Sequence, residues 1–491
     1  GYNSLSSATS GDNNVAVGSD AQFSNTVGDK NVAVGRSALL NFNPATDSDT
    51  FNTAVGHEAG KAVTTGVQNT FLGGLAADAL TVGNYNLAVG QNALSSDTKG
   101  NKTTAVGQGA LFAQNFTTAT DTLNVAVGYD AGVSLTTGVF NTLIGGLAGD
   151  ALTDADHNVA VGEDALAQDT LGSKSVAIGR TALFAQNFTT ATDSFNTAVG
   201  YAAGAAVTTG THNTLIGALA GDALTTGGSN VAVGYNSLST EDGHGGNVAV
   251  GTNVLAVQNA GATAYNAAVG HNAGLSVTTG TNNTLVGGLV ATSLNTGTDN
   301  VVIGQNAGTH SVAMTSGQFN VLVGAKTRNT ASDGDNANGF GYNIAAVSGF
   351  TTLGNADDDI RAAHGSTTWS TVSDERYKKD IEDSSLGLSF INALRPRTFN
   401  YKTKGELPDS FAAYEEDSTQ VFKSSEKQHG FIAQEVKVAI DSAGSDVASG
   451  FKLWNERPDG SQEIGEAALI PMLVKAIQEL SAEIEKLKSG G

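Results

Sequence analysis

The chain of 491 residues contains no cysteine, five prolines and only 15% charged residues. Without cysteine it cannot form a disulfide or a cysteine-based metal site, whichever compartment it occupies. It has no run of 18 apolar residues, which excludes a transmembrane helix, and no basic start followed by an apolar stretch, so no secretory signal is visible. Basic residues are scarce, and the net charge of −22 disfavours nucleic acid and anionic membranes as partners.

Hydrophobic residues make up 40% of the chain, too many for a disordered protein, and glycine occurs 62 times. The charge is unevenly distributed. Residues 1–372 contain ten basic and 26 acidic residues, whereas the much shorter segment 373–491 contains 15 and 21. The sequence therefore predicts two different kinds of protein joined near Ser373.

A five-residue motif that ends in glycine recurs in the first part, as NVAVG at 14–18, NTAVG at 52–56, NTFLG at 69–73 and NLAVG at 86–90. Successive motif glycines mostly follow a 17-residue spacing, and a 21-residue spacing occurs once in every four. Gly35, Gly107, Gly179 and Gly251 follow one another at an equal 72-residue spacing, so a unit of four coils is itself repeated. A fixed period of this kind predicts a solenoid.

Each motif position has an expected role. Asn begins 16 of the 18 complete motifs, with Thr103 and Ser175 as exceptions, and should mark a corner and form a ladder between coils. The residue before the glycine is always Val, Ile or Leu, and we expect it to point into the coil. With both faces apolar, the strand should be buried on both sides. Glycine then turns the chain at positive φ, and the Ala three residues later fits where coils press closely.

Coils this thin and rich in Ala bury little core, so we expect one strand face to pack against other copies of the chain. The motifs resemble the head repeats of trimeric autotransporter adhesins and related phage fibres, over roughly residues 1–324. The resemblance implies a mainly β fold, a trimeric left-handed parallel β-roll solenoid. Eighteen coils at about 4.8 Å would form a rod of roughly 85 Å. Because GYNSL at the start recurs at 234–238, we expect a distal fragment whose N-terminal anchor is missing.

The 21-residue coils contain long insertions, LLNFNPATDSDTFN (39–52), LFAQNFTTATDTLN (111–124) and LFAQNFTTATDSFN (183–196). They form either a receptor-binding ridge with Phe116 and Phe188 as contacts, or a brace between neighbouring chains, which their near-identity favours. His57 and His271 replace tyrosines of other coils and should be surface residues, not metal ligands. Residues 325–372 lose the period and should form a neck, in which Asp357, Asp358 and Asp359 suggest a solvated turn rather than a cation site.

The segment SDERYKKDI at 373–381 resembles the start of the intramolecular chaperone auto-processing domain of phage tailspikes and tail fibres, endosialidase tailspikes among them. LGLSFINALRPRTFNYK (386–402), HGFIAQEV (429–436) and a terminal apolar helix agree with that family, although Tyr377 stands where many relatives have Leu. The resemblance implies that 373–491 is an α+β domain that trimerises, aligns three fibre chains and then cuts itself off. Coils with near-identical motifs need such a domain, because a one-coil slip preserves most contacts.

In the family, the cut lies directly before the Ser of Ser-Asp, which here is the bond between Val372 and Ser373. A serine nucleophile needs a base, and a Ser373–Lys378 pair is the natural choice where no His is near in sequence. An ordinary lysine has a pKa of about 10.4, so a basic lysine needs burial and neighbouring cations. We expect trimer assembly to supply that burial.

Asp374 and Arg376 are expected to hold the turn or the oxyanion. The alternative is that Ser373 and Asp374 merely cap a helix that begins at Glu375. Together with the downstream segments, the pattern favours a single-turnover, self-cleaving serine peptidase that turns over no external substrate and needs no cofactor or metal.

The terminal helix has an apolar seam with a 3-4-3-4-3 spacing, which predicts a coiled coil over 469–488: Ile470, Leu473, Ile477, Leu480, Ile484 and Leu487. Ile at a and Leu at d favours two strands. The expectation of a homotrimer therefore depends on the repeats and on the resemblance.

The leading functional interpretation is a structural, host-surface-binding fibre of a virion tail or similar extracellular appendage, assembled in the host cytoplasm and matured by self-cleavage. Its receptor would be a glycan or an outer-membrane component. The alternatives are a bacterial surface adhesin, which lacks β-strand segments for an outer-membrane anchor here, and a polysaccharide-degrading tailspike. Against the tailspike, the acidic residues of 1–324 form no carboxylate pair in the sequence.

Overall fold

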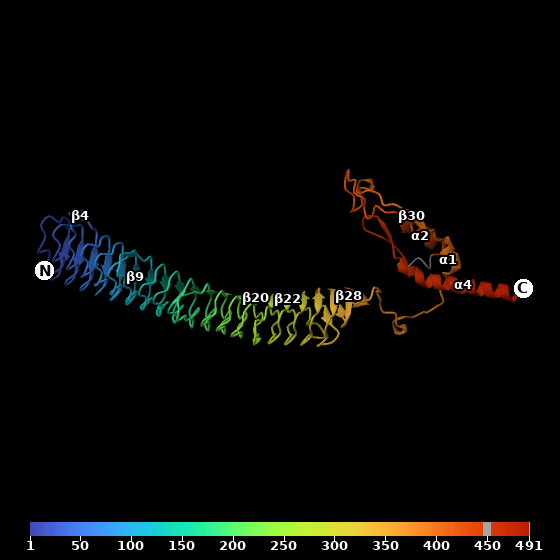
Figure 1. Cartoon of the computed structure of the whole chain (residues 1–491), viewed down its shortest axis with the longest axis horizontal. Coiled ribbons are helices and arrows are strands. Elements are labelled where there is room, and N and C mark those ends of the chain that lie inside the picture. Colours follow the sequence, from blue (N-terminus) through green and yellow to red (C-terminus); the bar gives the residue numbers. More distant parts are fainter. Residues whose placement is uncertain (445–452, 491) are drawn as a thin grey trace. The chain divides into compact units, whose positions relative to one another are not determined.

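The computed structural model describes residues 1–444 and 453–490, so residues 445–452 and 491 of the predicted C-terminal domain lie outside the described residues. The chain divides into two compact units, Gly1–Val372 and Ser373–Gly491. The first is a β-solenoid in which a short strand of each coil pairs with the strand of the next (Figure 1). The fold is thus mainly β, as the repeat predicts.

The solenoid is held together by a 21-stranded ladder. Its strands within the repeat are β1 (Val15–Val17), β3 (Val32–Val34), β5 (Thr53–Val55), β6 (Thr70–Leu72), β7 (Leu87–Val89), β9 (Thr104–Val106), β11 (Val125–Val127), β12 (Thr142–Ile144), β13 (Val159–Val161), β15 (Val176–Ile178), β17 (Thr197–Val199), β18 (Thr214–Ile216), β19 (Val231–Val233), β20 (Val248–Val250), β21 (Ala267–Val269), β22 (Thr284–Val286), β23 (Val301–Ile303) and β24 (Val321–Val323). All pair in parallel and in the same motif register, for example Ala126 with Leu143.

The middle residue of each strand points into the coil. Ala126, Ala160 and the bulkier Leu143 are completely buried, whereas Ile144, directly before the motif glycine, is 39% exposed. The prediction that the pre-glycine residue points inward is therefore wrong, whereas burial of the second strand face depends on packing against other copies of the chain. Successive side chains of a strand alternate, so the first and third residues of each strand share an outward face. This face is apolar except where the first residue is Thr, and the single chain leaves it partly exposed.

The motif glycines form a column in which no side chain fits. Gly56 has φ 145°, in the region that favours glycine. A Cβ there would lie 2.2 Å from the carbonyl oxygen of Gly73 in the next coil. The alanines that lie three residues after most motif glycines, such as Ala59 and Ala76, are completely buried, which confirms their predicted role.

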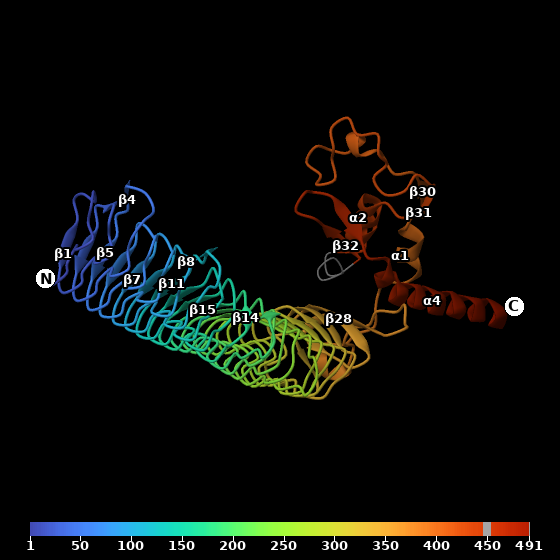
Figure 2. The same cartoon turned by 60° about the vertical axis from the view of Figure 1, so that its left-hand side comes forward.

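The motif asparagines form the predicted ladder. Asn52 donates from Nδ2 to the carbonyl of Gly66 at 2.9 Å, and its Oδ1 accepts the backbone N–H of Asn69 at 3.1 Å. Each such side chain therefore satisfies one buried donor and one buried acceptor of the backbone between coils. Figure 2 shows the closely stacked coils that result.

The two exceptions to the ladder have a structural reason. At Thr103, the side chain of Gln114 occupies part of the space that an Asn side chain fills in other coils. The Gln114 amide donates to Thr103 Oγ1 at 3.2 Å and to Asp97 Oδ2 at 2.7 Å. Gln114 Oε1 accepts from Asn124 Nδ2 at 2.9 Å. The same arrangement returns in the next four-coil unit, where Gln186 joins Ser175, Asp169 and Asn196.

The insertions add short parallel pairs outside the main ladder. These are β2 (Gly28–Asp29) with β4 (Ser48–Asp49), β8 (Gly100–Asn101) with β10 (Thr120–Asp121), and β14 (Gly172–Ser173) with β16 (Thr192–Asp193). Each insertion therefore folds back onto the preceding coil.

The segment expected to form a neck extends the ladder. Strands β26 (Asn338–Tyr342) and β28 (Phe350–Asn355) continue it in parallel, β29 (Asp358–Ala363) closes it antiparallel, and β25 (Arg328–Asn329) pairs with β27 (Ala345–Ala346). Asp358 and Asp359 belong to that closing strand.

The second unit is a small α+β domain. Its elements are the 3₁₀ helices η1 (Glu375–Tyr377), η2 (Lys404–Glu406) and η3 (Glu466–Leu469), the helices α1 (Leu388–Ala393), α2 (Ala433–Ser442) and α4 (Ile470–Ser489), and the antiparallel pairs β30 (Arg397–Phe399) with β31 (Gln428–Gly430) and β32 (Trp454–Glu456) with β33 (Gln462–Ile464). Phe390, Ile440 and Met472 lie in its core, and Glu479 Oε2 of α4 accepts the N–H of Leu388 at the start of α1, at 2.7 Å.

Candidate functional site

The predicted Ser–Lys pair is formed at the first residue of the second unit. Lys378 Nζ donates a hydrogen bond to Ser373 Oγ at 2.9 Å. The one-turn helix η1 lies between the two residues and brings their side chains together. Lys378 follows η1 directly, with its N–H bonded to the carbonyl of Glu375. The hydroxyl and the amine are thus adjacent through local chain geometry alone.

Asp374 caps η1, which is the alternative role considered for this stretch. One oxygen of its carboxylate accepts the N–H of Arg376 at 2.8 Å, and the guanidinium of Arg376 binds both oxygens, at 3.0 and 2.6 Å. The hydrogen bonds from Arg376 lower the pKa of Asp374 and raise the pKa of Arg376. Helix cap and Ser–Lys pair therefore coexist, and Arg376 holds the turn.

The site is open to solvent in the single chain. Ser373, Lys378 and Lys379 are exposed, and Val372 and Tyr377 are 50% and 81% exposed. A base needs a neutral lysine, and burial is what favours the neutral amine. The single chain supplies the contact between the two residues but not the burial.

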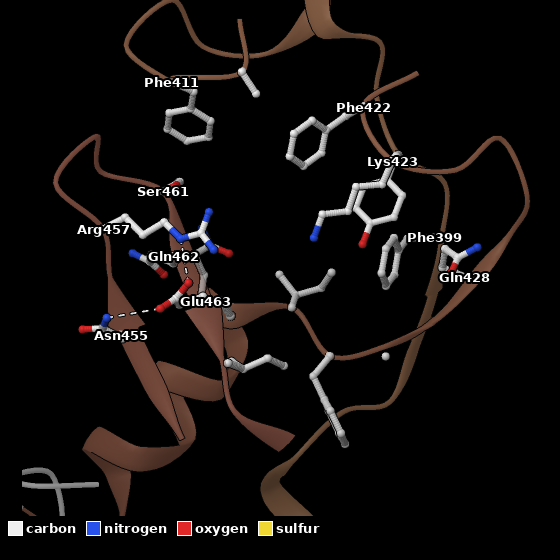
Figure 3. Close-up of a pocket in the computed structure, with 18 of the residues that line it drawn as sticks. Phe399, Phe411, Phe422, Lys423, Gln428, Asn455, Arg457, Ser461, Gln462 and Glu463 are labelled. Atoms are coloured by element: carbon white, nitrogen blue, oxygen red, sulfur yellow. Dashed lines mark hydrogen bonds and ion pairs between the residues drawn. The ribbon is translucent and has the colours of Figure 1, made fainter. Parts of the chain in front are cut away.

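A large pocket lies elsewhere in the same unit. Its volume is about 1010 Å³, and it lies between the β30–β31 pair, the β32–β33 pair and the chain around Phe411 and Phe422. Figure 3 shows Phe399 and Phe422 on one side and the Arg457–Glu463 ion pair, 2.6 Å, on the other. The residues that line it are far apart in sequence, so no local motif could have indicated it. Ser373 and Lys378 are not among them.

The seam predicted for the terminal helix is exposed along α4. Ile477, Ile484 and Leu487 are 65%, 49% and 78% exposed, whereas Met472 and Ala476 on the opposite side are buried in the domain core. The helix therefore has an outward apolar row that the single chain leaves uncovered. The described helices include none that is long and apolar enough to cross a membrane.

The two insertion phenylalanines predicted as receptor contacts are buried. Phe116 and Phe188 are only 6% and 5% exposed, so the prediction that these rings are receptor contacts is wrong. The N–H of Phe116 bonds to buried Asp97, whose pKa is raised by burial. The exposed rings of the insertions are instead Phe51 and Phe195, which directly precede the motif, and Phe112.

The histidines singled out in the sequence are surface residues. His57 contacts Arg36 at 3.2 Å, and His271 is exposed. Among the described residues, Glu241, Asp242 and His244 place potential ligand atoms within 4.8 Å of one another. However, both oxygens of Glu241 already accept hydrogen bonds, from Gln258 and from His244, so the cluster has a structural explanation.

Comparison with known families finds a similarity within the second unit. Residues 373–445 match the family model Peptidase_S74, described as chaperone of endosialidase. The comparison with curated proteins gives no match. The matched segment begins at Ser373, the residue at which the second compact unit begins and at which the Ser–Lys pair is formed. The solenoid is thus followed by a domain similar to a chaperone of endosialidase.

Proposed function

We propose that the protein is a trimeric fibre of a virion tail or similar appendage that attaches to a host surface. Its C-terminal domain assembles and aligns the three chains and then releases itself by cleavage between Val372 and Ser373. The single observation that carries the proposal is the 2.9 Å contact between Lys378 Nζ and Ser373 Oγ at the junction of the two units.

Two exposed apolar surfaces support assembly. The outward strand face of the solenoid and the α4 seam are uncovered in the single chain, and the family of the C-terminal domain implies a trimer. After the C-terminal domain has been cleaved off, unfolded fibre chains would have no domain to bring them into register for refolding. The mature fibre would then persist through slow unfolding rather than through refolding.

The cleavage chemistry follows from the position of Ser373 on the carboxyl side of the bond. Neutral Lys378 takes the proton from Ser373 Oγ, which attacks the carbonyl carbon of Val372. The peptide C–N bond breaks, the nitrogen of Ser373 takes the proton back from Lys378, and Val372 is held as an ester on Oγ. Water hydrolyses the ester, which gives a Val372 carboxylate and a free Ser373 N-terminus. Because burial in the trimer would favour the neutral form of Lys378, the reaction would wait until assembly is correct.

Gel electrophoresis of the full chain, boiled and unboiled, tests the proposal. The unsubstituted protein should give an SDS-resistant trimer and, after boiling, fragments that mass spectrometry shows to end at Val372 and to start at Ser373. Ser373→Ala and Lys378→Ala should trimerise uncut. Lys378→Arg should also remain uncut, because guanidinium cannot be deprotonated.

The matched control is Lys427→Ala, which removes an exposed lysine of the same domain and should be cut normally. Normal cutting of the Ser373→Ala protein at the same bond would remove Ser373 from the mechanism, and Ser373 and Asp374 would then be only a helix cap.

A further inference from the structure

Two columns of side chains border the outward strand face of the solenoid. The upstream edge residue of a coil directly precedes the motif Asn, and the downstream edge residue directly follows the motif Gly. In β12 these are Phe140 and Gly146. Six residues of extended chain span about 20 Å, so the two edges of one chain are well separated.

Residue size at the downstream edge follows the four-coil unit. The coils that contain the insertions have bulky residues at both edges: Phe51 and His57, Leu123 and Tyr129, Phe195 and Tyr201, Tyr265 and His271. In the coil that follows each of these, the downstream residue is small, and it is Gly74, Gly146, Ala218 and Gly288 in turn. The upstream residues of those coils have full side chains and are exposed: Gln68, Phe140, His212 and Asn282.

The chain itself does not need glycine at these positions. Gly74, Gly146 and Gly288 are not among the residues with positive φ. A Cβ built on Gly74 or Gly288 would meet nothing within 4 Å, and one on Gly146 would only touch the carbonyl oxygen of Tyr129 at 4.0 Å. The motif glycines are different, because there a Cβ would collide with backbone. Neither the backbone conformation nor the chain's own atoms require glycine at these positions. We infer that atoms from outside the chain approach them closely.

The outward strand face beside these glycines indicates that a second copy of the chain is what approaches them. Leu72, Ile144, Ile216 and Val286, the pre-glycine residues of the same coils, are 38–48% exposed. The α4 seam is a second apolar surface of the same chain that is uncovered. Where one edge lacks a side chain, the opposite edge presents Phe140, 44% exposed, or another full side chain. A second copy at the same level would place the upstream side chain of one chain against the downstream glycine of the other.

We propose that the two edges are the contact between neighbouring copies, with the upstream residue of one copy seated over the downstream residue of the next at the same level. This inference rests on the proposed trimer and adds the residues that set its register. Slipping one copy by one coil would put Phe140 against Tyr129 or Glu163 instead of Gly146. A slip of four coils would again place Phe140 against a small residue, Gly74 or Ala218. The fibre therefore fixes its register only within a unit, and the C-terminal domain must fix the rest.

Cross-linking tests the assignment on a background free of cysteine. The full chain with Phe140→Cys and Gly146→Cys should give a covalent trimer with a short bismaleimide, seen on a boiled gel. The two thiols of one chain are about 20 Å apart and cannot be bridged. Phe140→Cys with Tyr129→Cys, one coil away, and Phe140→Cys with Gly74→Cys, one unit away, are the controls and should remain unlinked.

A compensating pair gives a second test. Gly146→Phe is accepted by the single chain, which has open space there, but should lower the yield of SDS-resistant trimer about tenfold through overpacking between copies. Adding Phe140→Ala should restore the yield to within about twofold, and should not rescue Gly74→Phe.

The experiments distinguish failure of the edge contact from failure of the proposed function. Unlinked chains, or a harmless Gly146→Phe, in a protein that is trimeric on unboiled gels would overturn the edge contact and leave the proposed function intact. Preferential linkage of the one-coil pair would overturn the register. The absence of any trimer in the unsubstituted protein would overturn both.

Discussion

Asn213 offers the sharpest test of what holds the coils together. Its Nδ2 donates to the carbonyl of Gly227 at 2.9 Å, and its Oδ1 accepts the N–H of Asn230 at 3.0 Å, all within the buried ladder. Asn213→Ala removes both bonds and leaves one buried donor and one buried acceptor unpaired. Each unpaired group costs about 1–3 kcal/mol, so the local free energy of unfolding should fall by about 2–6 kcal/mol.

Hydrogen exchange followed by mass spectrometry measures this loss where it occurs. A loss of about 2 kcal/mol corresponds to about thirtyfold faster exchange if the amides exchange through local opening. The acceleration should appear in β18 and β19, on both sides of the substituted corner. Thr209→Ala, an exposed threonine of the same coil, is the control and should leave exchange within about twofold.

Asn213→Ser separates the hydrogen bonds from side-chain size. Serine is accepted at position 175 because the amide of Gln186 donates to its hydroxyl at 2.8 Å. We expect Asn213→Ser to be nearly as damaging as alanine, because its coil has no insertion to provide such a glutamine. Exchange rates within threefold of the parent for both variants would refute the view that the Asn ladder stabilises the solenoid.

Three other tests concern single side chains. Leu143→Ala should cost about 3–5 kcal/mol, measured by guanidinium-induced unfolding, because Leu143 is buried and its Cδ atoms fill the space beside Gly132 and Gly149. Phe116→Ala and Phe188→Ala should lower thermal stability by a similar amount and leave host-cell binding unchanged, since both rings are buried; the reverse result in melting and adsorption assays would contradict this. Burial raises the pKa of Asp97, so the folded coil binds a proton more readily than the unfolded chain. The stability it contributes should therefore rise as pH falls through the window between the raised and the ordinary value, and Asp97→Asn, followed by exchange at several pH values, should abolish that dependence.

The glycine column and the asparagine ladder, which depend on backbone conformation and backbone hydrogen bonds, could be predicted from the sequence. The motif glycines and asparagines satisfy conditions that hold within one or two coils, so their spacing was enough to indicate the column and the ladder. The inward direction was not predictable in the same way. A three-residue strand such as Val-Ala-Val is apolar on both faces, and only the packed coil shows that the middle residue, Ala126 for example, is inside.

The candidate site shows the same division. Ser373 and Lys378 are close in sequence and meet through one helical turn, which a local pattern can predict. The pocket beside Arg457 and Phe422 is built from distant segments, and the burial of Phe116 depends on an insertion that folds back onto the preceding coil. Neither has a signal in the neighbouring sequence.

The four-coil unit also governs how the length of such a protein can change. The segments 111–121 and 183–193 are identical in amino-acid sequence, which favours recombination between the parts of the gene that encode them. Joining the first to the second would delete one whole unit, yet every asparagine, glutamine and glycine would still meet its partner in the next coil. The loss of a single coil would instead bring Gln114 or a bulky edge against the wrong coil. Fibre length should therefore vary between descendants in steps of four coils, about 19 Å each.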